Sequence, residues 1–249
     1  MTDTEQRAKP HFQTSFYGVV SLLIFVIVIG GFSTTYFIPI ADGAFEHKNP
    51  YIHIHALIGT LWLLAYIVQT HLVAAGNRAL HMKLGKAGAL VALLFVVTGI
   101  LTFVAMTKIG IASDNEFQRY SAEILGVAPV TDLTLFTLLV GTALARRKPP
   151  QVHKRLIYLA SCLFVTPGMF RVMQWWVGDI PTPENGGLMI PLVFTAFIVA
   201  GPIYDKVTTG KVDRTYWWAL PVWALVFFGV PISIATGFWA PVANWIAGF

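Results

Sequence analysis

The stretch from residue 16 to residue 39 reads FYGVVSLLIFVIVIGGFSTTYFIP and contains no charged side chain. About 20 apolar residues are enough for a helix to cross the hydrocarbon core of a bilayer. Six more apolar runs follow, and none alternates apolar with polar residues, which argues for helices and against an outer-membrane barrel. The sequence therefore predicts an all-α polytopic transmembrane bundle of about seven spans. The later runs cover Pro50 to Ala75, Leu84 to Thr107, Pro129 to Ala145, Leu156 to Val177, Leu188 to Tyr204 and Tyr216 to Pro241.

The composition of the whole chain agrees with a membrane protein. Of its 249 residues, 56% are hydrophobic and 12% are charged, whereas an average soluble domain carries about 25% charged residues. The first apolar run is too long for a signal peptide and has no cleavage site close behind it, so we expect a retained helix. The sequence predicts a polar N-terminal segment over residues 1–15 and one transmembrane domain over residues 16–249.

Lys and Arg residues are unevenly divided between the two sides of the predicted bundle. Thirteen of the 17 lie in the N-terminal segment and in the second, fourth and sixth loops. The positive-inside rule therefore predicts a cytoplasmic N-terminus and an outer C-terminus in a bacterial inner membrane. Because the net charge of +5 comes from these short loops, we expect the lipid bilayer and not nucleic acid as partner. Aromatic belts are predicted at the two ends of the last span, formed by Trp217, Trp218, Trp239 and Trp245.

Three ionisable residues are predicted at similar depth in the outer half of the bundle, where such groups are costly and often functional. His55 shares one helix face with Trp62 and Tyr66, and this face is expected to line the interior. Asp132 and Arg171 belong to the fourth and fifth spans. These three residues are candidates for a cofactor site in which Arg171 holds an anionic group such as a propionate. An Asp132–Arg171 ion pair with a purely structural role is the alternative.

Imidazole and thioether side chains in the same half suggest a second kind of site. His53 and His55 begin the second span, His47 precedes it, and Met173 lies in the fifth. This combination of ligands suits copper, so these four residues are the candidate metal ligands. Methionine also fills gaps in apolar cores, which is the alternative for Met173.

A third candidate site lies at the cytoplasmic side. His81 and His153 begin the third and fifth spans and form the only pair of histidines predicted at one depth on different helices. A b-type haem held by two imidazoles needs such a pair. Both lie in basic clusters, so the alternative is that they anchor the helices at the interface or contact anionic lipid headgroups, without a cofactor. The two loops are also similar to each other in sequence, which leaves open whether they form an internal repeat.

These residues also carry a resemblance to known proteins. The middle two-thirds of the chain resembles a family of uncharacterised bacterial inner-membrane proteins with about seven helices. The likeness rests on His53-Ile54-His55-Ala56, Leu80-His81-Met82-Lys83-Leu84-Gly85 and His153-Lys154-Arg155-Leu156, with Trp62, Gln69, Asp132 and Arg171. It implies the topology and the choice of residues, but no reaction. The chain is more distantly similar to cytochrome b561 proteins, which place paired histidines at helix ends; not all of those pairs are present here.

The sequence leaves three functions open. It contains no catalytic motif that would indicate whether the protein is an enzyme. The first is redox chemistry or metal handling with haem b or copper. The second is a small-molecule or proton-coupled transporter, since prolines within the later spans permit kinked helices. The third is an accessory or assembly subunit that contacts other membrane subunits through exposed aromatic residues such as Trp175 and Trp176.

Overall fold

The computed structural model describes residues 13–45 and 49–248. Seven helical segments in these ranges are long and apolar enough to cross a membrane, which confirms the predicted helical bundle and span count. The segments are Phe16–Ala41, Pro50–Ala74, Arg78–Ile111, Val127–Ala145, Pro150–Val177, Met189–Thr209 and Arg214–Thr236.

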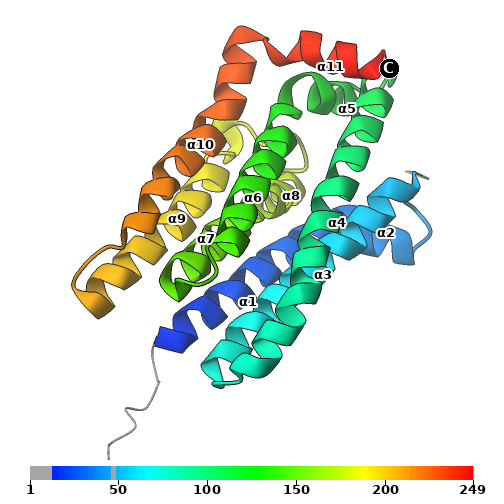
Figure 1. The fold of residues 1–249 in the computed structure, drawn as a ribbon. Helices are drawn as coiled ribbons and strands as arrows, with labels where there is room; N and C mark the ends of the chain where they lie inside the picture. The colour runs from blue at the N-terminus through cyan, green and yellow to red at the C-terminus, as the bar shows by residue number, and fades with distance from the viewer. Residues whose placement is uncertain (1–12, 46–48, 249) are drawn as a thin grey trace, which may run out of the picture.

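The described part of the chain contains eleven α-helices (Figure 1), and all of them except α5 and α11 belong to the spans. The helices are α1 (Gln13–Phe32), α2 (Ile38–Ala41), α3 (Pro50–Ala74), α4 (Arg78–Ile111), α5 (Glu116–Tyr120), α6 (Val127–Ala145), α7 (Pro150–Cys162), α8 (Val165–Val177), α9 (Met189–Thr209), α10 (Ala219–Thr236) and α11 (Trp239–Ala247). A π-helical segment, Ser33–Phe37, joins α1 to α2, and a second, Ser121–Leu125, follows α5. A 3₁₀ turn at Arg214–Trp218 begins the last span.

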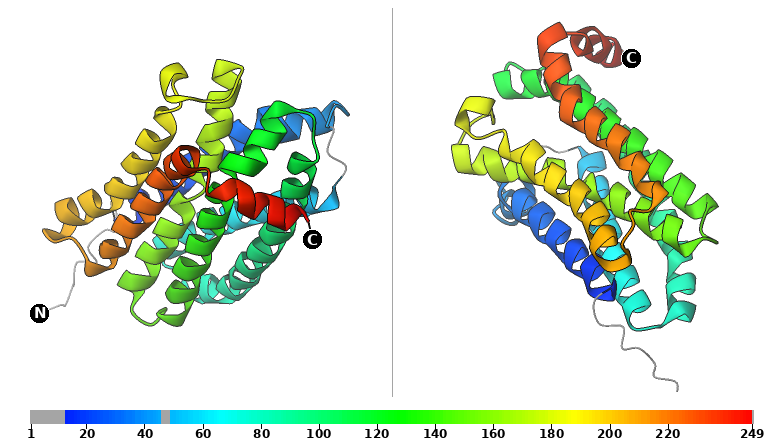
Figure 2. Two further views of the ribbon diagram at one scale, coloured as in Figure 1. Left: turned by 90° about the horizontal axis from the view of Figure 1, so that it is seen from above. Right: turned by 90° about the vertical axis from the view of Figure 1, so that its left-hand side faces the viewer.

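Helices α1, α3 and α4 form one side of the bundle, and α6 to α10 form the other (Figures 1 and 2). Helix α3 packs along α4, while α1 packs against both α3 and α8. On the other side, α6 packs against α7 and α10, and α8 against α9. The two sides therefore meet mainly along α1 and α8.

The fifth span, made of α7 and α8, lies at the centre of the bundle. In its apolar stretch 61% of the residues are buried, against 39% or less in every other span. The two helices are separate because Pro167, in the first turn of α8, has no N–H to donate to Leu163 and its ring crowds that carbonyl. Polar side chains on α7 are consequently held inside the protein.

The last span ends earlier than predicted: the predicted run reaches Pro241, but the helix stops at Thr236. Gly237 has a φ of +63°, which ends α10, and α11 then runs across the end of the bundle (Figure 1). There the Trp239 Nε1–H donates to the Ala122 carbonyl at 3.1 Å, and Trp239 is only 7% exposed. Trp239 is therefore a core residue and not part of an aromatic belt, whereas Trp245 is exposed.

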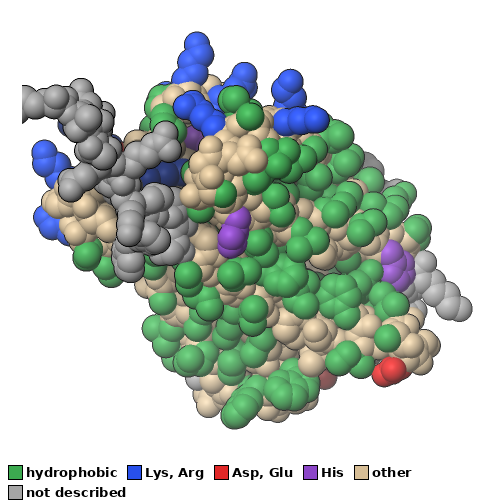
Figure 3. Space-filling view, turned by 90° about the horizontal axis from the view of Figure 1, so that it is seen from below, with side chains coloured by type: hydrophobic (Ala, Val, Ile, Leu, Met, Phe, Trp, Pro, Cys, Tyr) green, Lys and Arg blue, Asp and Glu red, His purple; other side chains and the backbone are tan. Residues whose placement is uncertain are grey.

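The turns at residues 75–77, 146–149 and 210–213 lie together at one end of the bundle, which we call the basic end. Figure 3 shows Lys and Arg side chains along one edge of a face that is otherwise largely hydrophobic. This separation suits an apolar body in lipid with basic loops at one membrane surface. That the basic end faces the cytoplasm stays a prediction.

Helices α1 and α8 approach each other at two glycines. A Cβ atom on Gly31 would collide with the carbonyl oxygen of Gly168 and lie 3.1 Å from its carbonyl carbon. Small residues let transmembrane helices pack this closely. We expect Gly31→Ala to destabilise the protein by about 1 kcal/mol or more, because two central helices must separate.

Gly30→Ala is the matched control, because a Cβ there meets nothing within 4 Å. Thermal unfolding in detergent, followed by helical circular dichroism, should show a lower midpoint for Gly31→Ala alone. Equal midpoints for the two variants would contradict the close packing of α1 on α8.

Candidate functional site

His55 lies on the interior face of α3, as predicted, since Trp62 and Tyr66 on the same face are buried. Its Nδ1 is 3.1 Å from the Thr98 hydroxyl of α4, and its ring stacks on Phe95 with 4.6 Å between centres. The Thr98 hydroxyl donates its proton to the Leu94 carbonyl at 2.7 Å. The His55 Nδ1–H must therefore be the donor to Thr98, and Nε2 carries the free lone pair.

The expected Asp132–Arg171 ion pair is not found in the described part of the chain, where ion pairs involve only Arg155. Arg171 turns toward α1 instead: its Nη1 donates to the Pro167 carbonyl at 3.0 Å, and its guanidinium lies 4.0 Å from the centre of the Phe32 ring. Among the described residues, no hydrogen bond or ion pair links His55, Asp132 and Arg171 to one another. A cofactor role for these three residues stays a prediction.

His53 and Met173, two other candidates predicted in the same half, have different neighbours. His53 Nδ1 lies 3.0 Å from the Tyr36 hydroxyl, and His47 lies outside the described residues. Met173 is buried on α8 beneath Gly186, which favours the packing role. Within residues 13–45 and 49–248, no three His, Cys, Asp or Glu side chains cluster closely enough to hold a metal ion.

His81 and His153 are the predicted site residues that the structure brings together. Their rings, from α4 and α7, have centres 6.5 Å apart and planes at 83° to each other. The His153 Nδ1–H donates to the Ala143 carbonyl at 2.9 Å, which leaves Nε2 with a free lone pair. The pair lies near the basic end, as the sequence predicted.

Gln69 of α3 lies beside His81. With its amide oriented so that donors meet acceptors, the Gln69 nitrogen donates to His81 Nδ1, and its oxygen accepts from the Gly85 N–H at 3.1 Å. In this state His81 carries its proton on Nε2. Rotation of the Gln69 amide would present its oxygen to Nδ1 and release the Nε2 lone pair. Gln69 therefore selects the tautomer of His81.

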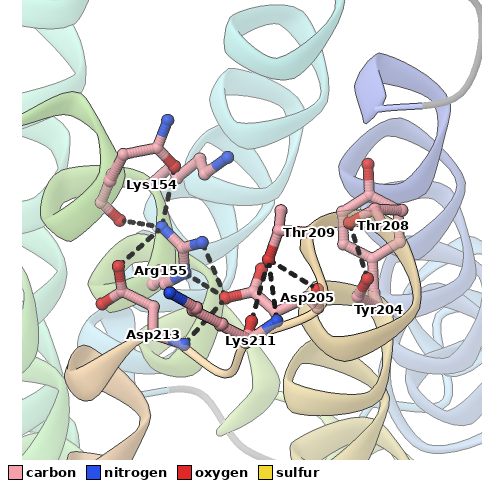
Figure 4. A pocket seen from close by; sticks show the side chains of 9 residues that line it. Lys154, Arg155, Tyr204, Asp205, Thr208, Thr209, Lys211 and Asp213 are labelled. Carbon is pink, nitrogen blue, oxygen red and sulfur yellow. Dashed lines mark hydrogen bonds and ion pairs between the residues drawn. The ribbon is translucent and has the colours of Figure 1, made fainter.

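A buried ion pair that was not predicted from the sequence involves Arg155, two residues after His153 (Figure 4). Arg155 of α7 is 4% exposed, and its Nε and Nη2 donate to Asp205 Oδ2 of α9 at 2.9 and 2.6 Å. Its Nη1 donates to the Gln151 carbonyl and side-chain oxygens, both at 2.8 Å, and lies 3.6 Å from Asp213. Arg155 thus joins α7, α9 and the loop that precedes the last span.

The sequence did contain a signal for this pair. Because Pro150 begins α7, Arg155 lies in its second turn, on the face that continues into the buried Tyr158, Leu159 and Cys162. The predicted fifth run begins only at Leu156, so Arg155 was assigned to the basic loop before it. Asp205 directly follows the predicted sixth run, inside the last turns of α9.

Asp213, which lies outside the spans, has a pKa below its usual range. Burial alone would raise this pKa, but the Thr215 N–H and hydroxyl donate to its carboxylate at 2.8 and 2.6 Å. The positive charges of Arg155 and Lys154 lower the pKa further. Asp213 is therefore a carboxylate at neutral pH and faces Arg155 as a second, weaker counter-ion.

Trp175 and Trp176, near the end of α8, are 65% and 77% exposed. Such exposure suits both a docking surface and a lipid interface, so the accessory-subunit hypothesis stays a prediction. The chain matches no protein-family model, no curated protein and no solved structure. The two resemblances inferred from the sequence accordingly stay predictions.

Proposed function

We propose that this integral membrane protein binds a b-type haem between His81 and His153 and transfers electrons in a bacterial inner membrane. The observation that carries the proposal is the 6.5 Å separation of the two ring centres. With metal–nitrogen bonds of about 2.0–2.1 Å and a ring radius of about 1.1 Å, imidazoles on opposite sides of one metal have centres about 6 Å apart. The two imidazoles are thus spaced so that both could hold one haem iron.

The number of protein ligands favours haem over a bare copper ion. A bare ion needs three or four donors from the protein, and the described residues offer no such group of His, Cys, Asp and Glu. A porphyrin supplies four nitrogens of its own, so two imidazoles complete the set. When bound, the haem iron would supply one-electron redox chemistry.

The contacts of His153 suit a ligand role, and those of His81 would suit it once the Gln69 amide rotates. Protein ligands to metals commonly engage their second ring nitrogen with a carbonyl or another polar group. His153 does so through the Ala143 carbonyl, and His81 can do so through Gln69. Arg78, three residues before His81, would provide positive charge for a propionate.

An optical spectrum of the gently solubilised protein, oxidised and dithionite-reduced, with elemental analysis of the same sample, tests the proposal. We expect a Soret band that shifts on reduction, with iron in stoichiometric amount. The double variant His81→Ala/His153→Ala should lose the band. His71→Ala is the matched control and should keep it, because His71 is an exposed α3 histidine bonded to its own helix at Ile67.

Two outcomes would overturn the haem assignment. One is a colourless, metal-free sample that gains no band on reconstitution with haem. The other is a band that survives the double substitution. Stoichiometric copper without porphyrin absorbance would instead assign the same two imidazoles to a bare metal ion.

A further inference from the structure

A cavity of about 250 Å³ opens at the basic end, between α7, the end of α9 and the following loop. Its floor contains the buried Arg155 and Asp205, and exposed Gln151, Thr209 and Lys211 form its rim (Figure 4). Because α7 begins and α9 ends here, the cavity lies where two spans leave the predicted membrane. This is the depth of lipid headgroups.

The acceptor groups of the lining are already occupied by the protein. Asp205 and Asp213 face Arg155, and the side-chain oxygen of Gln151 accepts from it at 2.8 Å. The hydroxyls of Thr208 and Thr209 donate their protons to the carbonyls of Tyr204 and Asp205. An incoming cation would therefore compete with Arg155 for every carboxylate.

The remaining charged groups of the lining are cationic, and the Lys154 ammonium group lies 5.3 Å from the centre of the Tyr17 ring. Lys154 and Lys211 flank Arg155 in Figure 4, and neither ammonium group forms an ion pair within residues 13–45 and 49–248. The amide nitrogen of Gln151 adds a neutral donor. Three cations and two carboxylates line the cavity, so its net charge is positive. These groups select an anion.

We propose that this cavity binds the phosphate group of an anionic lipid or of a small phosphate ester through Lys154 and Lys211. Basic pockets between transmembrane helices recognise such headgroups, and lysine is a common phosphate ligand. The cavity is smaller than the roughly 300–1,000 Å³ of typical sites for drug-sized ligands, which suits a headgroup. The site is independent of the haem proposal because it uses neither His81 nor His153.

The first experiment reconstitutes the full chain into phosphatidylcholine vesicles with and without phosphatidylglycerol, and measures lipid retained per protein after detergent extraction. We expect selective retention of phosphatidylglycerol, reduced about tenfold in Lys154→Gln/Lys211→Gln. Lys83→Gln/Lys86→Gln is the matched control, since it removes two exposed lysines at the same end but outside the cavity. This control should retain the lipid.

The second experiment compares thermal unfolding in inorganic phosphate and in chloride at equal ionic strength. Stabilisation by phosphate that disappears in the cavity variant, without selective lipid retention, would identify a soluble phosphate ester as the source. Equal lipid loss in both double variants, or no effect of either probe, would overturn the site. If the double variant does not fold, Lys211→Gln alone gives the same comparison, because Lys211 lies in an exposed loop.

Discussion

Replacement of Asp205 by Ala should lower the free energy of unfolding by about 3–5 kcal/mol, because it leaves the Arg155 guanidinium buried without a counter-ion. Asp205 is 1% exposed and accepts from Arg155 Nε and Nη2 and from the Asp213 N–H at 3.2 Å. Asp213 cannot compensate, since it lies 3.6 Å from Nη1 and its side chain is 31% exposed.

Two further variants make this prediction specific. Asp213→Asn should lower the free energy of unfolding by less than about 1 kcal/mol, as is usual for a partly exposed ion pair. Removing both buried charges in Arg155→Met/Asp205→Leu should restore most of the stability, because well-packed apolar residues often replace a buried pair at little cost. Unfolding in denaturing detergent, followed by circular dichroism, measures all three. Equal losses for Asp205→Ala and Asp213→Asn would show that the Arg155–Asp205 pair is not the main anchor of α7 on α9.

The span count was predictable because a backbone in hydrocarbon must satisfy its own hydrogen bonds, so each long apolar run forms a helix. The bounds of the second span were also predicted to within one residue. The predicted run covers Pro50 to Ala75, and α3 covers Pro50–Ala74. The ends of other runs were set by local backbone chemistry that hydropathy does not measure. Pro167 divides the fifth span, and Gly237 redirects the chain into α11.

Some contacts of the candidate site residues could be predicted from the sequence and others could not. Helix periodicity gave the interior face of His55, and the shared depth of His81 and His153 anticipated their contact. Depth alone does not give direction around a helix axis, so Asp132 and Arg171 were expected to pair although Arg171 turns to Phe32 on α1. The Arg155–Asp205 pair joins residues 50 apart in the chain, and such a contact depends on the tertiary packing of α7 against α9.

Gln69→Glu should strengthen haem binding by about 10- to 100-fold, because Gln69 controls which nitrogen of His81 is free. In the structure the Gln69 amide donates to Nδ1, so the proton of His81 occupies Nε2, the nitrogen that the metal needs. A glutamate at this position has only acceptors. It would hold the proton on Nδ1, leave Nε2 with a free lone pair and make the imidazole a better ligand.

Haem titration of the apoprotein measures this effect. The matched control is Gln174→Glu, which makes the same chemical change on α8. Affinity should rise for Gln69→Glu and stay unchanged for the control. If Gln69→Glu binds haem no more tightly than the unaltered protein while His81→Ala abolishes binding, His81 is a ligand whose tautomer Gln69 does not control. That result would show that Gln69 plays no part in the site, while His81 and His153 would still be the residues proposed to hold the haem.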